Sequence, residues 1–401
     1  MSKSAYILAT ISGRDKPGIT AAVTKILAES KVTIIDIGQA VIHELLSLSI
    51  LFSLEDDENE GKAVLKDLLF EANELGMKLD FQLLKDSEIP TRHLKPKLLR
   101  YVVTILAEKI GAEALHSVTN IVSKWGFNID TIQRLSEGEF ACVEMIISSD
   151  KEFSKNGLKK ELLEISFRSH VDVALQEDGP FRRMKRLIAF DMDSTLIQNE
   201  IIDELAKERG VFDEVSKITE SAMQGKMDFQ ESLTKRVALL KGLKPDDLKR
   251  VADRIQITPG AKELIVMLKK LGYKVALISG GFTHFAERLR SELQLDYVYA
   301  NELEMDHGVV TGTVRSPIVD AQRKADLLEV IAQNERISLD QVIAVGDGAN
   351  DLKMLEKAGL GIAFNAKALV REKADLAYNQ KNLRSILHLL GFRTEEIKRF
   401  I

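Results

Sequence analysis

Three short apolar runs in the C-terminal half of the chain constrain its fold most strongly. They cover residues 187–190, 274–278 and 341–345, and each ends in a polar or glycine-rich turn that leads toward a helical pattern. Because strands buried on both faces of a parallel sheet are continuously apolar, this alternation predicts a parallel α/β sheet. In such sheets functional side chains gather beyond the carboxyl ends of the strands. The ends of these runs are therefore where functional residues are expected.

The residues before these runs show one pattern of strands and helices twice. The first copy is expected to have strands over residues 6–11, 32–37, 46–54 and 77–84 and helices over 19–27 and 63–75. The second copy is expected to have strands over residues 98–107, 128–135, 139–147 and 171–176 and helices over 112–125 and 158–170. Each copy follows β-α-β-β-α-β, the ferredoxin-like pattern. Two divergent copies of one module are the simplest account, and two unrelated domains are the alternative, because the copies share pattern more than identity.

The length of the chain and one polar stretch suggest how these parts are divided. A chain of 401 residues is too long for a single ordinary core. The polar, proline-containing residues 86–97 are typical of a linker. We expect two small modules over residues 1–90 and 91–180 and a larger domain over residues 181–401. The predicted fold class is α/β, with a Rossmann-like parallel sheet that follows two ferredoxin-like (βαββαβ) modules.

Composition and charge narrow the class of protein. Hydrophobic residues make up 45% and charged residues 29% of the chain, as in ordinary globular proteins. The net charge of -5 argues against a nucleic-acid or anionic-membrane partner, so an anionic substrate would need a locally basic pocket. We expect a cytoplasmic protein, because the N-terminus lacks signal-peptide features and no apolar run reaches the roughly 18 residues that span a membrane. The single cysteine, Cys142, lies in an apolar run and is expected to be a buried strand thiol.

Two acidic residues follow the first apolar run directly. Asp191 and Asp193 are separated by one residue, at a place where the backbone leaving a strand bends quickly. Alone, Asp193 or the neighbouring Ser194 could simply cap a helix. In the catalytic interpretation, Asp191 attacks phosphorus to form an aspartyl-phosphate, and Asp193 is the general acid and base that serves the leaving alkoxide.

Ser279 and Gly280 follow the second apolar run and begin a glycine turn before a helix. A hydroxyl group and the N–H groups of a helix start can hold phosphate oxygens, although ordinary turns use the same residues. Lys324, at a later helix start, would alone be a solvated surface lysine. In the catalytic interpretation Lys324 has a role, because phosphoryl transfer among several anions needs a cation on the phosphoryl oxygens.

The third apolar run leads into a loop that contains two acids and an amide, Asp347, Asn350 and Asp351. Carboxylate oxygens suit Mg²⁺, which binds few carboxylates and keeps waters and phosphate oxygens. A loop of this composition at a strand end is rarely structural. We therefore expect Mg²⁺ as the cofactor, and Mn²⁺ could replace it because the ligands are oxygen atoms only.

Taken in order, these four motifs resemble those of the haloacid-dehalogenase (HAD) superfamily: DxDxT, a Ser or Thr, a Lys, and GDxxxD. The resemblance covers residues 187 to about 390. It implies that Asp191, Asp347 and the backbone carbonyl of Asp193 bind Mg²⁺. It also implies that Ser279 and Lys324 hold the phosphate. In the last loop, the resemblance implies supporting roles for two polar residues. Asn350 would lie near the phosphate, and Asp351 would orient Lys324 or a metal-bound water.

About 80 residues separate the first two motifs, enough for a helical cap over residues 199–258. Two stretches resemble the phosphoserine phosphatases: residues 193–206, which lead into the cap, and residues 223–242, which lie within it. This resemblance implies that Glu200 holds the substrate ammonium group and that Arg236 clamps the substrate carboxylate. It also implies that apolar residues close over the substrate, namely Met223 and Phe229. Without the resemblance, Glu200 would be a first-turn helix acid and Arg236 a surface residue.

The resemblance implies hydrolysis of O-phosphoserine to serine and phosphate through an aspartyl-phosphate, the last step of serine biosynthesis. A HAD phosphatase or phosphotransferase for another phospho-amino acid is the alternative, because a single methyl group is worth only ~1–3 kcal/mol in a pocket. A dehalogenase is disfavoured because it would lack the second acid, Asp193. An amino-acid-sensing regulator with a decayed catalytic half is disfavoured because the acids and the lysine are intact.

The N-terminal modules resemble ACT domains, a family of small amino-acid-sensing units. In the first copy the resemblance rests on residues 13–18, where Pro17 suits a first helical turn, Asp15 can cap it, and Gly18 lets a ligand carboxylate approach N–H groups. A good helix start without a ligand is the plainer interpretation. We expect serine to bind at Asp15 and Gly18 as a regulatory ligand, at a module–module interface in a homodimer. The second copy lacks the proline at residues 108–112 and is expected to serve in pairing.

Overall fold

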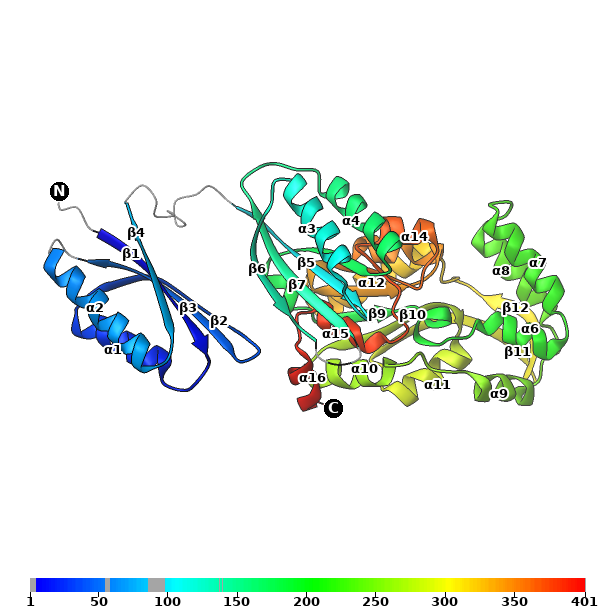
Figure 1. Ribbon diagram of the computed structural model, residues 1–401. Coiled ribbons are helices and arrows are strands. Elements are labelled where there is room, and N and C mark those ends of the chain that lie inside the picture. Colours follow the sequence, from blue (N-terminus) through cyan, green and yellow to red (C-terminus); the bar gives the residue numbers. More distant parts are fainter. Residues whose placement is uncertain (1–4, 55–57, 86–97, 137, 139, 401) are drawn as a thin grey trace. The chain divides into compact units, whose positions relative to one another are not determined.

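The computed structural model describes residues 5–54, 58–85, 98–136, 138 and 140–400, and Figure 1 shows its helices and strands. The chain forms two compact units, residues 1–96 and residues 97–401. The second unit contains both the second module and the C-terminal domain. Among the described helices, none combines the length and the apolar character that crossing a membrane requires.

The first unit contains a four-stranded antiparallel sheet in the order β2-β3-β1-β4 and two helices. Its elements are β1 (Ala5–Arg14), α1 (Ile19–Glu29), β2 (Thr33–Ile42), β3 (Leu45–Leu54), α2 (Glu58–Glu74) and β4 (Lys78–Leu84). Alternate residues of β1, such as Ile7, Ala9 and Ile11, join Val23 and Leu27 of α1 in one apolar cluster. The predicted β-α-β-β-α-β order is confirmed.

A second sheet of the same design opens the second unit, in the order β6-β7-β5-β8. Its elements are β5 (Leu99–Ala107), α3 (Ala112–Lys124), β6 (Asn128–Arg134), β7 (Ala141–Ser149), α4 (Lys155–Ser169) and β8 (Asp172–Glu177). One face of this sheet packs against α3 and α4. From the other face, Leu106, Cys142 and Ala174 join the core of the C-terminal domain. Cys142 is therefore a buried strand thiol, as predicted.

The C-terminal domain is built on a seven-stranded sheet in the order β12-β11-β10-β9-β13-β14-β15. Its strands are β9 (Leu187–Phe190), β10 (Lys274–Phe282), β11 (Tyr297–Asp306), β12 (Val309–Arg315), β13 (Val342–Gly346), β14 (Leu360–Phe364) and β15 (Leu376–Tyr378). All neighbouring pairs are parallel except β11 and β12. The chain builds outward from β9 to β10 on one side and to β13 on the other. Such a reversal opens a crevice at the carboxyl ends of the strands.

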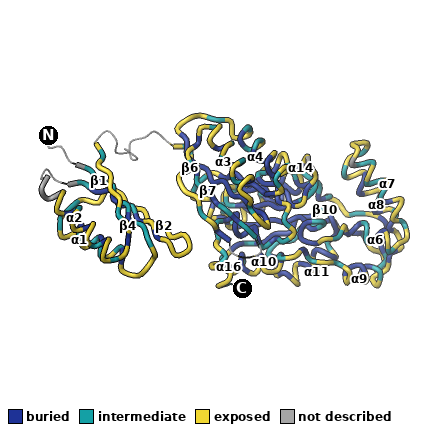
Figure 2. Tube along the Cα trace, in the orientation of Figure 1, coloured by how far each residue is buried: buried dark blue, intermediate teal, exposed yellow. Residues whose placement is uncertain are grey.

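Strand β9 explains why the sequence shows continuous apolar runs. Ile188 and Phe190 face one apolar cluster, and Leu187 and Ala189 face the other. Figure 2 shows β10, the neighbour of β9 in this sheet, mostly in the buried colour. The helices of the domain outside the cap are α5 (Pro180–Arg183), α10 (Ala261–Lys270), α11 (Thr283–Leu293), α12 (Ala321–Asn334), α13 (Leu352–Lys357), α14 (Ala368–Lys373), α15 (Ile386–Leu389) and α16 (Thr394–Phe400). A strand covered on both faces has no polar side, so alternation is absent.

Four helices between β9 and β10 form the cap. They are α6 (Ile201–Arg209), α7 (Phe212–Met223), α8 (Phe229–Leu239) and α9 (Pro245–Arg254). The sequence predicted the first three and missed α9, although Pro245 at its first turn, followed by Asp246 and Asp247, is a helix-start signal. The cap lies beside β11 and β12 in Figure 1, and the N–H of Gly242 donates to the carbonyl of Val310 at 2.9 Å.

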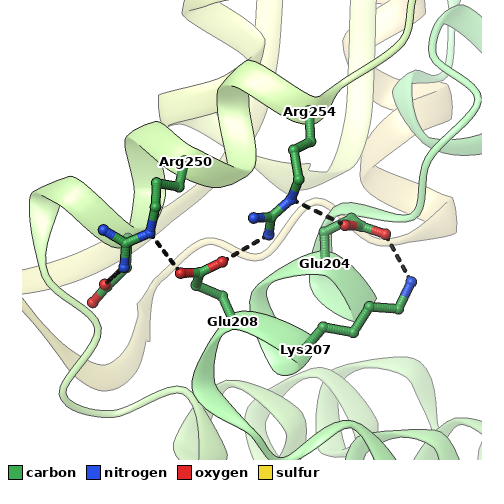
Figure 3. Close-up of polar contacts among 6 residues, drawn as sticks. Glu204, Lys207, Glu208, Arg250 and Arg254 are labelled. Atoms are coloured by element: carbon green, nitrogen blue, oxygen red, sulfur yellow. Dashed lines mark hydrogen bonds and ion pairs between the residues drawn. The ribbon is translucent and has the colours of Figure 1, made fainter.

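Ion pairs fasten α9 to α6 within the cap (Figure 3). Arg250 and Arg254 each donate to a different oxygen of Glu208, both at 2.8 Å. Arg254 Nε also lies 3.8 Å from Glu204, whose other oxygen accepts from Lys207 at 2.8 Å. Exposed pairs stabilise a fold little on their own. Their geometric effect is to fix the axis of α6, the helix that begins directly after the predicted ammonium-binding residue.

Candidate active site

The first predicted catalytic residue lies at the carboxyl end of β9, in the crevice. The N–H of Asp191 donates to the carbonyl of Val345 on β13 at 2.9 Å, which continues the sheet to its edge. One carboxylate oxygen of Asp191 accepts from the N–H of Met192 at 2.7 Å. Ser194 then has a φ of 52°, so the chain turns sharply through the left-handed region. This turn separates the paths of the two acids of the motif.

Lys324 is buried inside the site rather than solvated. Its Nζ lies 2.8 Å from Asp191 Oδ1 and 2.7 Å from Asp351 Oδ1, and its side chain is 0% exposed. Burial acts to lower the pKa of Lys324, but the attraction of these two carboxylates outweighs it and raises the pKa. The lysine comes from the first turn of α12, which Asp320 caps. A surface lysine is thus excluded, and a fixed positive charge lies beside Asp191.

Three carboxylates converge around this lysine. Oxygen atoms of Asp191, Asp347 and Asp351 all lie within 4.8 Å of one another. Burial, together with the negative charges of Asp351 and Asp191, raises the pKa of Asp347 to about 8. Oxygen donors gathered in this way fit a hard divalent cation. The sequence placed Asp351 in a supporting role, and here it belongs both to the acidic group and to the lysine ion pair. Thr195, which sequence reasoning missed, has its hydroxyl 3.4 Å from Asp347.

Asp193 lies between the strand end and the start of the cap. Its Oδ1 accepts from the N–H of Ile201 at 3.2 Å, in the first turn of α6. Burial, followed by the charges of Glu200 and Asp191, raises the pKa of Asp193 well above its usual value. A carboxyl group that is protonated more readily than usual suits a group that donates a proton.

The predicted glycine turn forms the last part of β10, residues 279–282, where the pairing with β11 is irregular. This predicted phosphate-binding turn lies against the same site. Ser279 is fully buried, and its Oγ accepts from the N–H of Gly281 at 2.9 Å. A Cβ atom at Gly281 would lie 2.4 Å from Met192 and 3.0 Å from Asp193. A Cβ atom at Gly280 would lie 3.0 Å from the ring of Phe229 on α8. The glycines therefore let the turn approach both the acids and the cap, as the phosphate-binding interpretation requires.

The predicted recognition residues of the cap face the acids. Glu200 precedes α6 and accepts from the hydroxyl of Ser194 at 2.6 Å. Arg236 on α8 lies close enough to Glu200, Asp203 and Asp193 for their charges to act on it. It also lies 3.5 Å from the hydroxyl of Thr219 on α7. One acidic and one basic side chain thus lie on the cap side of the residues that are predicted to bind phosphate.

The two remaining residues of the predicted substrate site are Asn350 and Met223. Asn350 lies in the loop with the acids, and its Oδ1 would be 2.2 Å from a Cβ atom placed at Gly348. The Asn350 side chain therefore lies against Gly348, whose N–H donates to Asp351 Oδ2 at 3.0 Å. The side chain of Met223 is outside the described part of the structure, although its backbone ends α7.

The predicted regulatory residues lie in the first unit. Asp15 and Gly18 line a surface pocket, whose full lining is Asp15, Lys16, Pro17, Gly18, Ile19, Thr20, Ala21, Gln39 and Leu46. The expected cap by Asp15 and the place of Pro17 in the first helical turn are wrong. Gly18 takes the N-cap position with a φ of 100°, no side chain caps α1, and the helix begins at Ile19. A left-handed glycine sets the entry of the chain there, so Pro17 precedes the helix.

Comparisons with known proteins agree with this arrangement. Residues 185–359 match the model of haloacid dehalogenase-like hydrolases, and residues 5–82 and 100–176 each match an ACT domain model. The chain is 38% identical to phosphoserine phosphatase SerB2 of Mycobacterium tuberculosis, over 99% of this chain and 96% of the relative. It is 40% identical to a phosphoserine phosphatase of Streptomyces coelicolor, over 98% and 93%. A solved structure of a probable phosphoserine phosphatase from Vibrio cholerae has a TM-score of 0.59 at 35% identity, over 74% of this chain and 88% of that one.

Proposed function

This chain belongs to the phosphoserine phosphatases of the haloacid dehalogenase-like hydrolase family, and we propose that it hydrolyses O-phosphoserine to serine and phosphate through an aspartyl-phosphate on Asp191. The observation that carries this proposal is the buried Lys324, which bridges Asp191 and Asp351 beside the oxygens of Asp347. This cluster supplies a nucleophile and a fixed cation at one strand end. Because the product is serine, the reaction is a step of serine biosynthesis. The resemblance implies that it is the last step.

The residues divide the chemistry as follows. A carboxylate oxygen of Asp191 forms a bond to phosphorus while the bond from phosphorus to the serine oxygen breaks, and Asp193 gives its proton to that oxygen. Water then attacks phosphorus while Asp193 takes a proton from the water. The bond from phosphorus to Asp191 breaks, which releases phosphate and restores the free carboxylate. Ser279 and Lys324 hold the phosphoryl oxygens during both steps. The raised pKa of Asp193 supports its role as the acid of the first step.

Mg²⁺ is the cofactor we propose. Asp191, Asp347 and the backbone carbonyl of Asp193 would hold it, and the position of Asp351 within the same acidic group supports an additional contact. When bound, the ion neutralises charge so that an anionic phosphate can approach an anionic nucleophile. Removing divalent ions with a chelator should abolish turnover. Adding back Mg²⁺ or Mn²⁺, but not Ca²⁺ of larger radius, should restore it.

For the substrate, we propose that Glu200 binds the ammonium group and Arg236 the carboxylate of phosphoserine. Phe229 and Met223 would close over the substrate, and the contact between Phe229 and Gly280 supports this for Phe229. Arg236→Ala should reduce kcat/KM for phosphoserine far more than for p-nitrophenyl phosphate, which has no carboxylate. Lys235→Ala, which removes a positive charge from the preceding residue of α8, is the matched control and should affect neither. Equal losses for both substrates would contradict the clamp.

The proposed reaction is tested at the nucleophile. Asp191→Asn should abolish turnover of phosphoserine and also covalent labelling of the protein by radioactive phosphoserine. Labelling that persists in this variant would refute the assignment of Asp191. A panel of phosphoserine, phosphothreonine and sugar phosphates separates the proposed activity from a phosphatase for another phospho-amino acid. A phosphotransferase would be recognised by transfer of phosphate to an added amino acid instead of release to water.

We also propose that serine regulates the enzyme by binding at Asp15 and Gly18, and that the chain forms a homodimer. The surface pocket at these residues supports the first part, and the ACT domains support small-molecule regulation in general. Serine inhibition should be measured before and after deletion of residues 1–90, together with the mass in solution by light scattering. Unchanged inhibition would mean simple product competition at the active site, and a monomeric mass would contradict the dimer.

A further inference from the structure

Asn301 is a buried amide that neither the sequence motifs nor the proposed mechanism uses. It lies on β11 beside the end of β10, paired in register with Phe282, and is 1% exposed. Its Nδ2 donates to the carbonyl of Gly280 at 2.7 Å, and its Oδ1 accepts from the N–H of Val319 at 2.7 Å. Because one partner can only accept and the other can only donate, the orientation of the amide is unambiguous.

The bond to Gly280 acts on the phosphate-binding turn through one peptide plane. The carbonyl of Gly280 and the N–H of Gly281 belong to the same planar peptide group. Asn301 holds the carbonyl side, and the N–H side donates to Ser279 Oγ at 2.9 Å. Since Ser279 Oγ accepts this bond, its own hydrogen is directed elsewhere and can be donated to an anion. Two linked hydrogen bonds therefore run from Asn301 to the hydroxyl of Ser279 and polarise each other.

The bond to Val319 connects the same amide to the lysine helix. Val319 precedes Asp320, the N-cap of α12, and the N–H of Lys324 donates to the carbonyl of Asp320 at 2.9 Å. The two segments also touch, because a Cβ atom at Gly280 would lie 3.6 Å from the carbonyl oxygen of Val319. One side chain thus spans the elements that carry Ser279 and Lys324.

We propose that Asn301 is a positioning residue for phosphate binding. It fixes the turn at Ser279 and the approach to α12 in one relative geometry, so that the serine hydroxyl and the lysine ammonium address the same phosphoryl group. This inference rests on the proposed function, in which Ser279 and Lys324 hold phosphate. In this proposal the Asn301 side chain does not itself contact the phosphate. Such preorganisation matters because donors misplaced by a small distance lose most of their effect on a charged ligand.

The test measures binding of inorganic phosphate to the full chain with Mg²⁺ by calorimetry. Asn301→Asp keeps the acceptor for Val319 but places a carboxylate oxygen against the carbonyl of Gly280. Its phosphate affinity should fall about 10- to 100-fold, the usual size of a lost buried hydrogen bond. Asn301→Ala, which lacks the repulsion, should show a smaller loss. Asn334→Asp makes the same change at the exposed end of α12 and should bind phosphate like the wild type.

A double-mutant cycle with Ser279→Ala separates positioning from general destabilisation. If Asn301 acts through the serine hydroxyl, Asn301→Asp should lower phosphate affinity much less in the Ser279→Ala background than in the wild type. Additive losses, or an Asn301→Asp protein that binds phosphate normally, would overturn the proposal. If neither Asn301 variant folds, as judged by circular dichroism, the residue is a folding determinant and the proposal is also wrong. A wild-type protein that binds phosphate but does not hydrolyse phosphoserine would instead refute the proposed function alone.

Discussion

The environment of Lys324 defines the electrostatics of the site. An ammonium group that is fully buried would be strongly unfavourable alone, and here Asp191 and Asp351 compensate it at 2.8 and 2.7 Å. The group still has more negative than positive charge, since two carboxylates face one ammonium group. A phosphate could not enter against that charge unaided. The charges of these residues therefore support the proposed divalent cation independently of any comparison.

Asp193 should matter most for poor leaving groups. In Asp193→Asn the serine alkoxide has no proton donor, so we expect phosphoserine turnover to fall about 10²- to 10⁴-fold. The p-nitrophenolate ion is a far weaker base and leaves without a proton. This variant should therefore release a burst of p-nitrophenol from p-nitrophenyl phosphate and accumulate phosphorylated protein, because the water step still lacks its base. Stopped-flow absorbance measures the burst, and Asp191→Asn must show none. Equal slowing of the first step for both esters would contradict the acid role.

Lys185 offers a test of buried charge outside the catalytic site. It is 4% exposed, and its Nζ donates to the carbonyl of Asp340 at 2.6 Å. Burial lowers its pKa to about 8, against the opposing effect of Asp340 and Asp375. Between pH 8 and its unfolded pKa of about 10.4, the unfolded chain binds more protons than the folded one. The free energy of unfolding should therefore rise with pH across this window, by about 3 kcal/mol in total, relative to Lys185→Met. A difference between the two proteins that is independent of pH would contradict the shift.

At the scale of elements, the sequence predicted those features that depend on residues close together in the chain. The continuous apolar character of residues 187–190 follows from burial on both faces, and it located Asp191 at a strand end. The environment of Lys324 could not be predicted from its own helix pattern, because the carboxylates that pair with it come from the segments after β9 and β13. Gly18 displaced Asp15 as the cap, since a left-handed residue sets the entry of α1. Asn301 was missed because its partners are backbone groups, which leave no mark in a sequence.

The cap and the core are joined by a hydrogen bond close to the site. Gln230 of α8 donates to Asp320 Oδ2 at 2.8 Å, while Asp320 Oδ1 accepts from the N–H of Arg323 and caps α12. Phe229, the preceding residue, lies against Gly280. The cap therefore bonds to the N-terminus of the same helix that carries Lys324. We expect this contact to favour a cap position that encloses substrate and excludes water.

Removing this bond should loosen closure without disturbing the helix. Gln230→Ala leaves the capping oxygen of Asp320 in place, so thermal stability should stay unchanged. We expect kcat/KM for phosphoserine to fall about 2- to 10-fold, the size of one exposed hydrogen bond to a charged group. Gln322→Ala is the matched control, because Gln322 bonds to Asp326 and Lys353 on the core side. Similar losses in both variants would show that the cap contact has no special role.

At the scale of the whole molecule, the second ACT domain belongs to the same compact unit as the catalytic domain. In the second one, Asp172 accepts from the N–H and Nδ2 of Asn379 at 2.9 and 2.8 Å and from Gln380 at 2.9 Å. Glu144 on the same sheet forms a buried ion pair with Arg182. This domain is therefore part of the catalytic unit, whereas residues 1–96 form a compact unit of their own.

The two domains should therefore differ in whether the enzyme can lose them. A chain of residues 97–401 keeps Leu106, Cys142 and Ala174 in the shared core and should retain both its folding and its turnover of phosphoserine. A chain of residues 181–401 would expose that apolar surface and leave Arg182 without Glu144. Because a large exposed apolar surface promotes association, we expect this shorter chain to be less stable and to aggregate. Thermal unfolding, size-exclusion chromatography and kcat/KM measure the three consequences. If residues 181–401 were as stable and monodisperse as residues 97–401, the second ACT domain would be an appendage of the catalytic domain rather than a part of its core.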